Sequence, residues 1–170
     1  MKTPKFRMAK KIASMALVLV LGTGVASCAN GNSQEAPAAD DDAMHITMAV
    51  IGPDENGDPE LYAPEMDTMV HPGADDAWGL SQTLFSMGEL EYDASNSDYG
   101  IMLNSITSPV DGTILAFDEA SGCYWQLFVN GEASEVGISE VELEDGMEII
   151  WYYSAFGDTL PDLTALPQAA

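Results

Sequence analysis

The stretch "YWQLFVNGE", residues 124–132, decides the fold that the sequence predicts. Residues 124–129 are aromatic or aliphatic apart from one glutamine, which is typical of a strand. The stretch then reaches Asn130-Gly131, the pair that two-residue hairpin turns prefer because both turn positions need a positive φ. Side chains of a strand alternate between its faces, so Tyr124 and Trp125 point in opposite directions. We therefore predict a β-hairpin that carries a large aromatic side chain on each face.

The rest of the chain predicts strands placed before and after a single helix. Asp75 or Asp76 can cap the start of that helix, and Gly88 is a natural stop. Pro64 places the second strand at a sheet edge, because proline has no N–H to donate. The order of the elements predicts an α+β fold. The expected strands are residues 45–51, 60–66, 89–92, 99–106, 122–131, 135–138 and 148–154.

A set of short motifs recurs in a fixed order through the second half of the chain. The motifs are Tyr124-Trp125, Val129-Asn130-Gly131, Val136-Gly137-Ile138, "LEDG" at 143–146 and "IIWY" at 149–152. In this order and spacing they resemble the DUF4430 family, the bacterial relatives of the C-terminal domain of transcobalamin and intrinsic factor. The resemblance implies that residues 44–156 form a β-grasp-like mixed sheet packed on one helix. It also implies binding of a soluble ligand, because in the vitamin carriers this domain covers one face of cobalamin.

The beginning of the chain has the layout of a secretory signal. A basic head precedes an apolar run at 12–21, and small residues lead to "VASC", which resembles the bacterial lipobox. We predict a lipoprotein signal peptide at residues 1–27, with Cys28 as the lipidated residue. The alternatives are a plain signal peptide with a chance cysteine, or an uncleaved anchor. The predicted protein is exported and faces outward, and it touches the bacterial cell membrane only through its lipid.

Two further segments flank the predicted domain. Residues 28–43 are small, polar and acidic, so they predict a flexible tether. Residues 157–170 contain two prolines and few large side chains, and they predict a weakly ordered tail.

Charge is divided unusually along the chain. All 5 Lys and Arg residues precede Cys28, and all 28 Asp and Glu residues follow it. Nucleic acid is excluded as a partner, because nothing after Cys28 can neutralise phosphate. The acidic surface either keeps an exported protein soluble, or selects neutral or cationic ligands or Ca²⁺.

The sequence predicts neither a metal site nor an enzyme. "DENGDPE" at 54–60 has oxygen ligands at alternate positions, but Pro59 stands where a calcium loop needs glycine. Cys123 has no partner besides Cys28, and it is expected to be a small buried residue rather than a reactive thiol. No nucleophile elbow or phosphate-binding loop is present, and no cofactor is expected.

Aromatic residues are the candidate ligand-binding residues. In the last strand, Trp151 and Tyr152 lie on opposite faces, as Tyr124 and Trp125 do in the hairpin, with Asn130 at the turn. One face of the sheet would be open for binding, unless loops or the tail cover it. The resemblance suggests cobalamin or another corrinoid, captured and delivered to a membrane transport protein. The alternative function is a protein–protein docking or structural module of a surface assembly, which a flat patch or an unpaired edge strand would favour.

Overall fold

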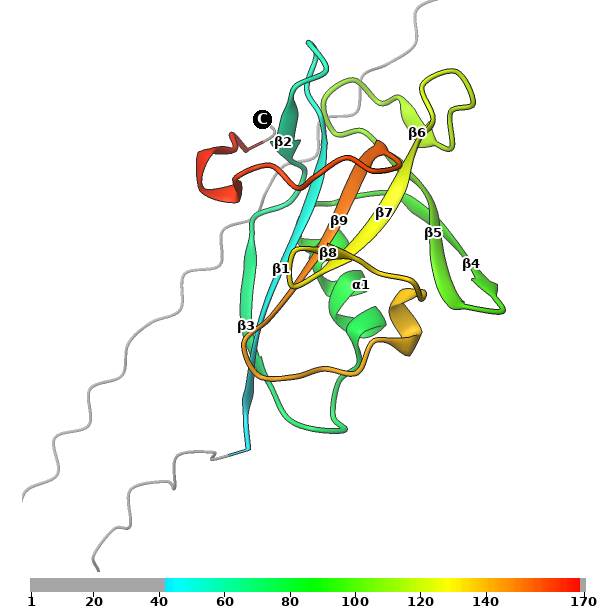
Figure 1. Ribbon diagram of the computed structural model, residues 1–170. Helices are drawn as coiled ribbons and strands as arrows, with labels where there is room; N and C mark the ends of the chain where they lie inside the picture. The colour runs from blue at the N-terminus through cyan, green and yellow to red at the C-terminus, as the bar shows by residue number, and fades with distance from the viewer. Residues whose placement is uncertain (1–41, 169–170) are drawn as a thin grey trace, which may run out of the picture. The chain divides into compact units, whose positions relative to one another are not determined.

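The structure, a computed structural model, describes residues 42–168. Within this range one α-helix, α1 (Ala77–Met87), packs with nine strands in two sheets, which confirms the α+β class (Figure 1). The predicted signal peptide, Cys28 and most of the predicted tether lie outside the described residues.

The larger sheet has six strands, and its centre is a parallel pair formed by the first and the last strand of the domain. The strand order is β2-β1-β9-β7-β8, with β3 also paired to β1. All pairs are antiparallel except β1 with β9. The strands are β1 (Met44–Pro53), β2 (Pro59–Leu61), β3 (Met66–Val70), β7 (Cys123–Val129), β8 (Glu132–Ala133) and β9 (Met147–Ala155).

The smaller sheet has three antiparallel strands, with β5 in the middle. Its strands are β4 (Tyr92–Ser97), β5 (Gly100–Thr107) and β6 (Ile114–Ala116). In Figure 1, β5 and β7 lie close together near β6 and diverge toward β8. Strands β5 and β7 are therefore adjacent at one end, although they belong to different sheets.

Helix α1 begins and ends for different local reasons. The Asp76 carboxylate accepts a hydrogen bond from the Gly79 N–H at 2.6 Å, so Asp76 is the cap that the sequence predicted. Gly88 ends the helix as predicted, but its φ is −83°. Glycine is needed there because a Cβ atom would lie 2.8 Å from the Ala63 Cβ. The left-handed residue is the following Glu89, with φ 52°.

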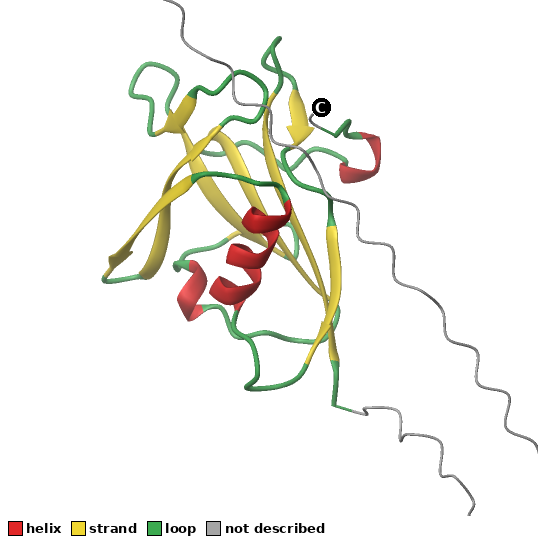
Figure 2. Ribbon diagram, turned by 180° about the vertical axis from the view of Figure 1, so that it is seen from behind, coloured by secondary structure: helices red, strands yellow, loops and turns green. Residues whose placement is uncertain are grey.

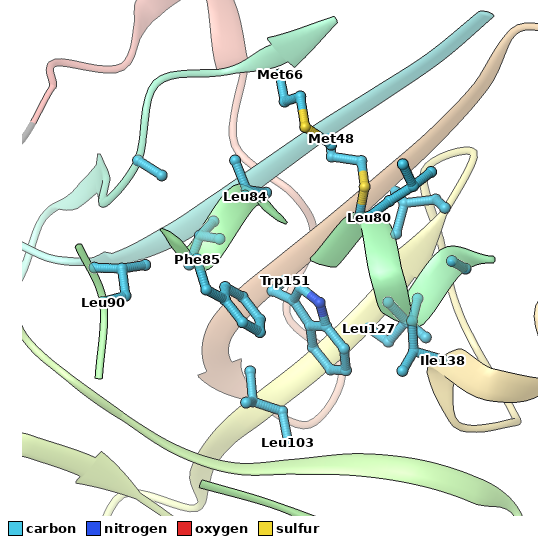
Figure 3. Packing of buried hydrophobic residues seen from close by; sticks show 14 of the residues in the cluster. Met48, Met66, Leu80, Leu84, Phe85, Leu90, Leu103, Leu127, Ile138 and Trp151 are labelled. Atoms are coloured by element: carbon cyan, nitrogen blue, oxygen red, sulfur yellow. The ribbon is translucent and has the colours of Figure 1, made fainter. Parts of the chain in front are cut away.

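One face of the larger sheet packs against α1 (Figure 2). Alternate residues of the central strands form this core with the buried side of the helix. Trp151 lies at its centre, between Phe85 and Leu127, and is 1% exposed (Figure 3). Its indole N–H donates to the Ser81 hydroxyl at 3.1 Å, which satisfies a buried polar group.

The opposite face of the sheet is covered by the segment after β9. Ile150 and Phe128 pack with the leucines of residues 160–166, which include the 3₁₀ turn η2 (Leu163–Ala165). The Leu61 N–H donates to the Pro167 carbonyl at 2.9 Å, so the segment is also tied to β2. In Figure 1 this segment crosses in front of the sheet, and α1 lies behind it. The residues predicted to be a weakly ordered tail therefore form the cover that the sequence analysis left as an alternative.

Several predicted strands differ from those of the structure. The predicted strand 60–66 is divided into β2 and β3 by a bend, and the strand placed at 89–92 begins only at Tyr92. The strand predicted at 135–138 is wrong, because these residues lead into the 3₁₀ turn η1 (Ile138–Glu140). Gly137 packs so closely on β5 that a Cβ atom would lie 2.5 Å from the Ile101 carbonyl oxygen. Because of this contact, the segment around Gly137 lies against the smaller sheet and does not pair with β7.

Candidate ligand-binding groove

Two adjoining pockets lie along the boundary between β7 and β5, and together we call them the intersheet groove. The inner pocket has a volume of about 420 Å³ and the outer pocket about 550 Å³. Both are lined by Met102, Tyr124 and Trp125. The inner pocket adds Gln126, Leu127, residues 133–137, Trp151 and Phe156, and the outer pocket adds Leu103, Asn104, Ala116 and Phe117.

Large apolar side chains are exposed around the groove. Phe156 is 86% exposed, Phe117 is 68% exposed, and Met102 and Val136 are also exposed. Exposed apolar groups gathered around a concavity are typical of binding sites. Phe117 and Phe156 could not be predicted as site residues from the sequence, because both directly follow a strand, where the alternation of side chains gives no prediction. The sequence feature that could have identified them is a large aromatic side chain directly after the end of a strand.

The walls of the groove are held in place by hydrogen bonds and ring contacts. The Trp125 indole N–H donates to the Leu115 carbonyl at 2.8 Å, and its ring lies 5.4 Å from that of Tyr153. The Gln126 amide donates to the Ser154 hydroxyl at 2.7 Å. Its carbonyl oxygen accepts from the Tyr124 hydroxyl at 3.2 Å. The groove is therefore built from side chains that are already fixed, as a preformed site requires.

The structure brings together three of the five predicted ligand-binding residues. Tyr124 and Trp125 line both pockets, and Trp151 lines the inner one. Tyr152 instead packs on Phe128, with ring centroids 6.3 Å apart, and burial raises the pKa of its hydroxyl. Asn130 occupies the hairpin turn with φ 51°, and its side-chain oxygen accepts from the Glu148 N–H at 2.9 Å. Neither Tyr152 nor Asn130 lines the groove.

The charge around the groove is negative or absent. Glu135 lines the inner pocket, and Asn104 is a polar residue of the outer one. No lysine or arginine occurs in residues 42–168. The groove therefore favours neutral or cationic ligands over anionic ones.

Carboxylates in the acidic loops accept hydrogen bonds from main-chain N–H groups of the same loop. The Asp54 carboxylate accepts hydrogen bonds from the Asn56 and Asp58 N–H groups at 2.7 and 2.8 Å. These bonds lower the pKa of Asp54. The stretch "DENGDPE" is thus a self-capped turn. In the described part of the chain, no group of three or more His, Cys, Asp or Glu residues is placed to hold a metal ion.

Glu60 is the buried carboxylate among the described residues. It is 7% exposed, and its Oε1 atom has no hydrogen-bond partner among the described residues. Burial raises its pKa above the ordinary value of 4.5, and the nearby charges of Asp54 and Glu55 raise it further. The charged form is therefore less favourable in the folded protein than in the unfolded chain. The contribution of Glu60 to stability is full below pH 4.5 and is lost as the pH rises through the folded-state pKa.

Replacing Glu60 by glutamine is expected to stabilise the protein at pH 7 by on the order of 1 kcal/mol, because the buried charge is removed. Below about pH 4 the wild-type carboxyl is neutral too, so the gain should shrink. Urea unfolding of both proteins at pH 4 and pH 7 measures the difference. The exposed Glu144→Gln serves as the control. An equal effect of Glu60→Gln at both pH values would contradict the assignment.

The fold and the groove define a small α+β module with a concave apolar surface between two sheets. Residues 81–155 match the family model DUF4430, described as a domain of unknown function. This match runs from the middle of α1 to the end of β9 and confirms the resemblance drawn from the motifs. No curated protein matches the chain.

Solved structures that are similar to this chain include two of low sequence identity. Haptocorrin in complex with Cbi is 13% identical, with a TM-score of 0.48 over 67% of this chain and 25% of the haptocorrin chain. This chain thus spans about a quarter of haptocorrin. A protein of Ruminococcus gnavus ATCC 29149, described as metal-binding, is 18% identical, with a TM-score of 0.40 over 66% of this chain and 97% of its own. None of the helices among residues 42–168 is long and apolar enough to cross a bilayer.

Proposed function

We propose that this protein is an exported lipoprotein that binds a soluble ligand in the intersheet groove. Cys28 would carry the lipid and hold the domain on the outer surface of a bacterial cell membrane. The ligand would be captured there and passed to a membrane transport protein. The observation that carries the proposal is the exposed apolar side chains around a preformed concavity, above all Phe117 and Phe156.

The ligand would be flat, partly apolar, and neutral or cationic. The outer pocket is lined by the exposed Phe117 and the half-buried Tyr124, with the buried Trp125 beneath them, and these aromatic side chains suit an aromatic or macrocyclic surface. Asn104 supplies a polar group there. A single shallow pocket would cover one side of such a ligand and leave the other side for a partner.

The resemblance to DUF4430 makes cobalamin or another corrinoid the first ligand to test. We also propose that the helix-backed sheet is a β-grasp fold, because its central parallel pair β1 and β9 is flanked by antiparallel strands. A corrinoid phosphate in the groove could be held only by main-chain N–H groups and neutral side chains, since residues 42–168 contain no lysine or arginine and neither pocket is lined by a histidine. A corrinoid without the phosphate should therefore bind better than one with it.

The role proposed is binding without catalysis. The polar side chains of the groove that could move a proton are already engaged, Tyr124 with Gln126 and Gln126 with Ser154. Glu135 is exposed at the rim of the inner pocket.

Calorimetric titration of the chain from Ala29 onward, with corrinoids that carry or lack the phosphate, tests the proposal. Saturable binding is expected, and Phe117→Ala should weaken it about tenfold or more, because an exposed aromatic contact is lost. Met69→Ala is the matched control, since Met69 is 71% exposed but lies on β3, away from the groove. No heat at high micromolar corrinoid, or equal losses in the two variants, would contradict the corrinoid site.

A further inference from the structure

Strand β3 forms an outer edge of the larger sheet. Among the described residues it pairs only with β1, in a regular antiparallel register from Met48 opposite Met66 to Met44 opposite Val70. In Figure 1, β3 lies at the margin of the sheet, on the side of β1 away from β9. No isolated bridge and no loop hydrogen bond within residues 42–168 reaches β3. One edge of β3 is therefore unpaired in this part of the chain.

The hydrogen bonds of β1 show which of its main-chain groups face β3. The His45 N–H donates to the Asp145 carboxylate at 2.8 Å, and the His45 carbonyl accepts from the Gly146 N–H at 2.8 Å. Both partners directly precede β9, so odd-numbered residues of β1 face β9. The Val50 carbonyl instead accepts from the Tyr62 N–H at 2.8 Å, on the side of β2 and β3. Even-numbered residues of β1 therefore face β3.

The main-chain groups of Asp67 and Met69 consequently lie on the open edge. The even-numbered residues of β1 stand opposite Met66, Thr68 and Val70, so these three residues form the hydrogen-bonded pairs with β1. The two residues between them point their N–H and C=O groups outward. Asp67 is exposed and Met69 is 71% exposed, so an incoming chain can reach these groups.

The side chains of β3 give the edge a different chemistry on each face. Met66 and Val70 are buried in the core that packs on α1. Asp67 and Met69 point to the opposite face, where the Asp67 carboxylate lies 3.0 Å from the His45 imidazole Nε2. The edge is thus apolar on the face toward α1, and acidic with an exposed methionine on the other.

The edge of β3 is less protected than the open edge of β4. Free edges are commonly protected by a bulge, a proline or a charge. The register of β4 with β5 shifts between Asp93 and Ala94, which interrupts that edge. The five residues of β3 contain no proline, and their register is regular. The one protective feature within β3 is the charge of Asp67, which repels acidic segments and attracts basic ones.

We propose that the open edge of β3 receives an extended, basic segment of a partner protein as an added strand. The outward N–H and C=O groups of Asp67 and Met69 would pair with the main chain of this segment. Its basic side chains would lie beside the Asp67 carboxylate, and their aliphatic stems would cover Met69. Its apolar side chains, on the other face, would extend the core beside Met66 and Val70.

Charge complementarity selects this occupant. Asp67 and the preceding Glu65 place two exposed carboxylates at the edge, and residues 42–168 contain no lysine or arginine. A second copy of this chain would bring the same carboxylates together, and repulsion would oppose the pairing. Residues 28–41 also carry acidic and no basic side chains, so charge argues against them as well.

This edge is separate from the intersheet groove. Strands β1 and β9 lie between β3 and β7 in the sheet, and no residue of β3 lines either pocket of the groove. The inference therefore does not rest on the small-ligand proposal, and a negative result for one leaves the other standing.

Amide hydrogen exchange by NMR, on the chain from Ala29 onward, tests the added strand. The probe is the peptide acetyl-Val-Lys-Val-Lys-Val-amide, without any corrinoid. Millimolar peptide is expected to slow exchange of the Asp67 and Met69 amides at least about fivefold, because both become ladder donors. The Thr68 amide, which already faces β1, is the internal control and should change little. Unchanged exchange at Asp67 and Met69 would overturn the proposal.

Methylated forms of the probe test whether the main chain makes the contact. N-methylation of the lysine amides or of the valine amides blocks N–H groups on opposite edges of the extended peptide. Only one of the two modified peptides should therefore lose binding. Equal affinities of the two would overturn strand addition and leave a charge contact only.

The charge of the partner is tested from both sides of the contact. Asp67→Asn is expected to weaken binding of the basic probe several-fold, because the carboxylate beside the lysines is lost. Asp98→Asn is the matched control, since Asp98 is exposed in the turn between β4 and β5. The acidic peptide acetyl-Val-Glu-Val-Glu-Val-amide should not bind. Equal losses in the two variants, or equal binding of the two peptides, would overturn the assignment of a basic partner.

Discussion

Replacing Trp151 by alanine is expected to lower the free energy of unfolding by about 3–5 kcal/mol. The indole is 1% exposed and lies among Phe85, Leu127 and Ile138 at the centre of the core (Figure 3). The truncation would remove this buried surface, leave a cavity and break the hydrogen bond to the Ser81 hydroxyl. A domain of this size has a total stability of about 5–15 kcal/mol, so the variant would be close to unfolding.

Urea unfolding followed by circular dichroism measures this effect. Tyr99→Ala is the control, because Tyr99 is 67% exposed and its loss should change stability by less than about 0.5 kcal/mol. Trp151→Phe should fall between the two, since it keeps much of the ring volume and loses the hydrogen bond. A loss below about 1 kcal/mol in Trp151→Ala would show that the core tolerates the cavity, contrary to the packing described. Loss of ligand binding in Trp151→Ala is therefore no measure of ligand contact.

Replacing Cys28 by serine is expected to move the protein almost completely from the membrane fraction to the soluble fraction. Two or more acyl chains anchor a protein stably, at about 0.8 kcal/mol per buried methylene, and serine cannot carry the thioether. Nothing else in the proposed arrangement holds the acidic domain to a membrane, since anionic lipid repels it. Metabolic labelling with a fatty acid, followed by fractionation, measures both lipid attachment and location.

Cys123→Ser is the matched control for this experiment. Cys123 is a half-buried residue of β7, and its replacement should leave both lipid labelling and membrane association unchanged. A Cys28→Ser protein that stays in the membrane without label would favour the uncleaved anchor over the lipobox. Label that persists in Cys28→Ser and disappears in Cys123→Ser would contradict the lipidation site.

Local features of the fold could be predicted because they depend on neighbouring residues. Asp76 caps α1 by reaching an N–H three residues ahead, and Asn130-Gly131 turns the hairpin with φ values of 51° and 83°. Alternation likewise separates Tyr124 from Trp125 in β7 and Trp151 from Tyr152 in β9. In each case the deciding interactions lie within a few residues of one another.

The remaining features depend on contacts between distant segments. The strand predicted at 135–138 is absent because Gly137 meets β5, about forty residues earlier in the chain. The sheet face left open in the prediction is covered by Leu160, Leu163 and Leu166, whose contacts are with strands far away in the chain. The candidate residues were therefore divided between a covered face and a groove.

The parallel pairing of β1 with β9 also constrains how the chain can be made and transported. The centre of the larger sheet joins residues 46–51 to residues 147–152, so it cannot assemble until nearly the whole domain is available. Contacts of such long sequence separation form slowly, and a chain still emerging from the ribosome has β1 but not β9, its central partner. In the proposed export, the polypeptide would stay unfolded for as long as its last strand is missing. The order of the strands would thus allow such a protein to cross a membrane unfolded and to fold on the other side.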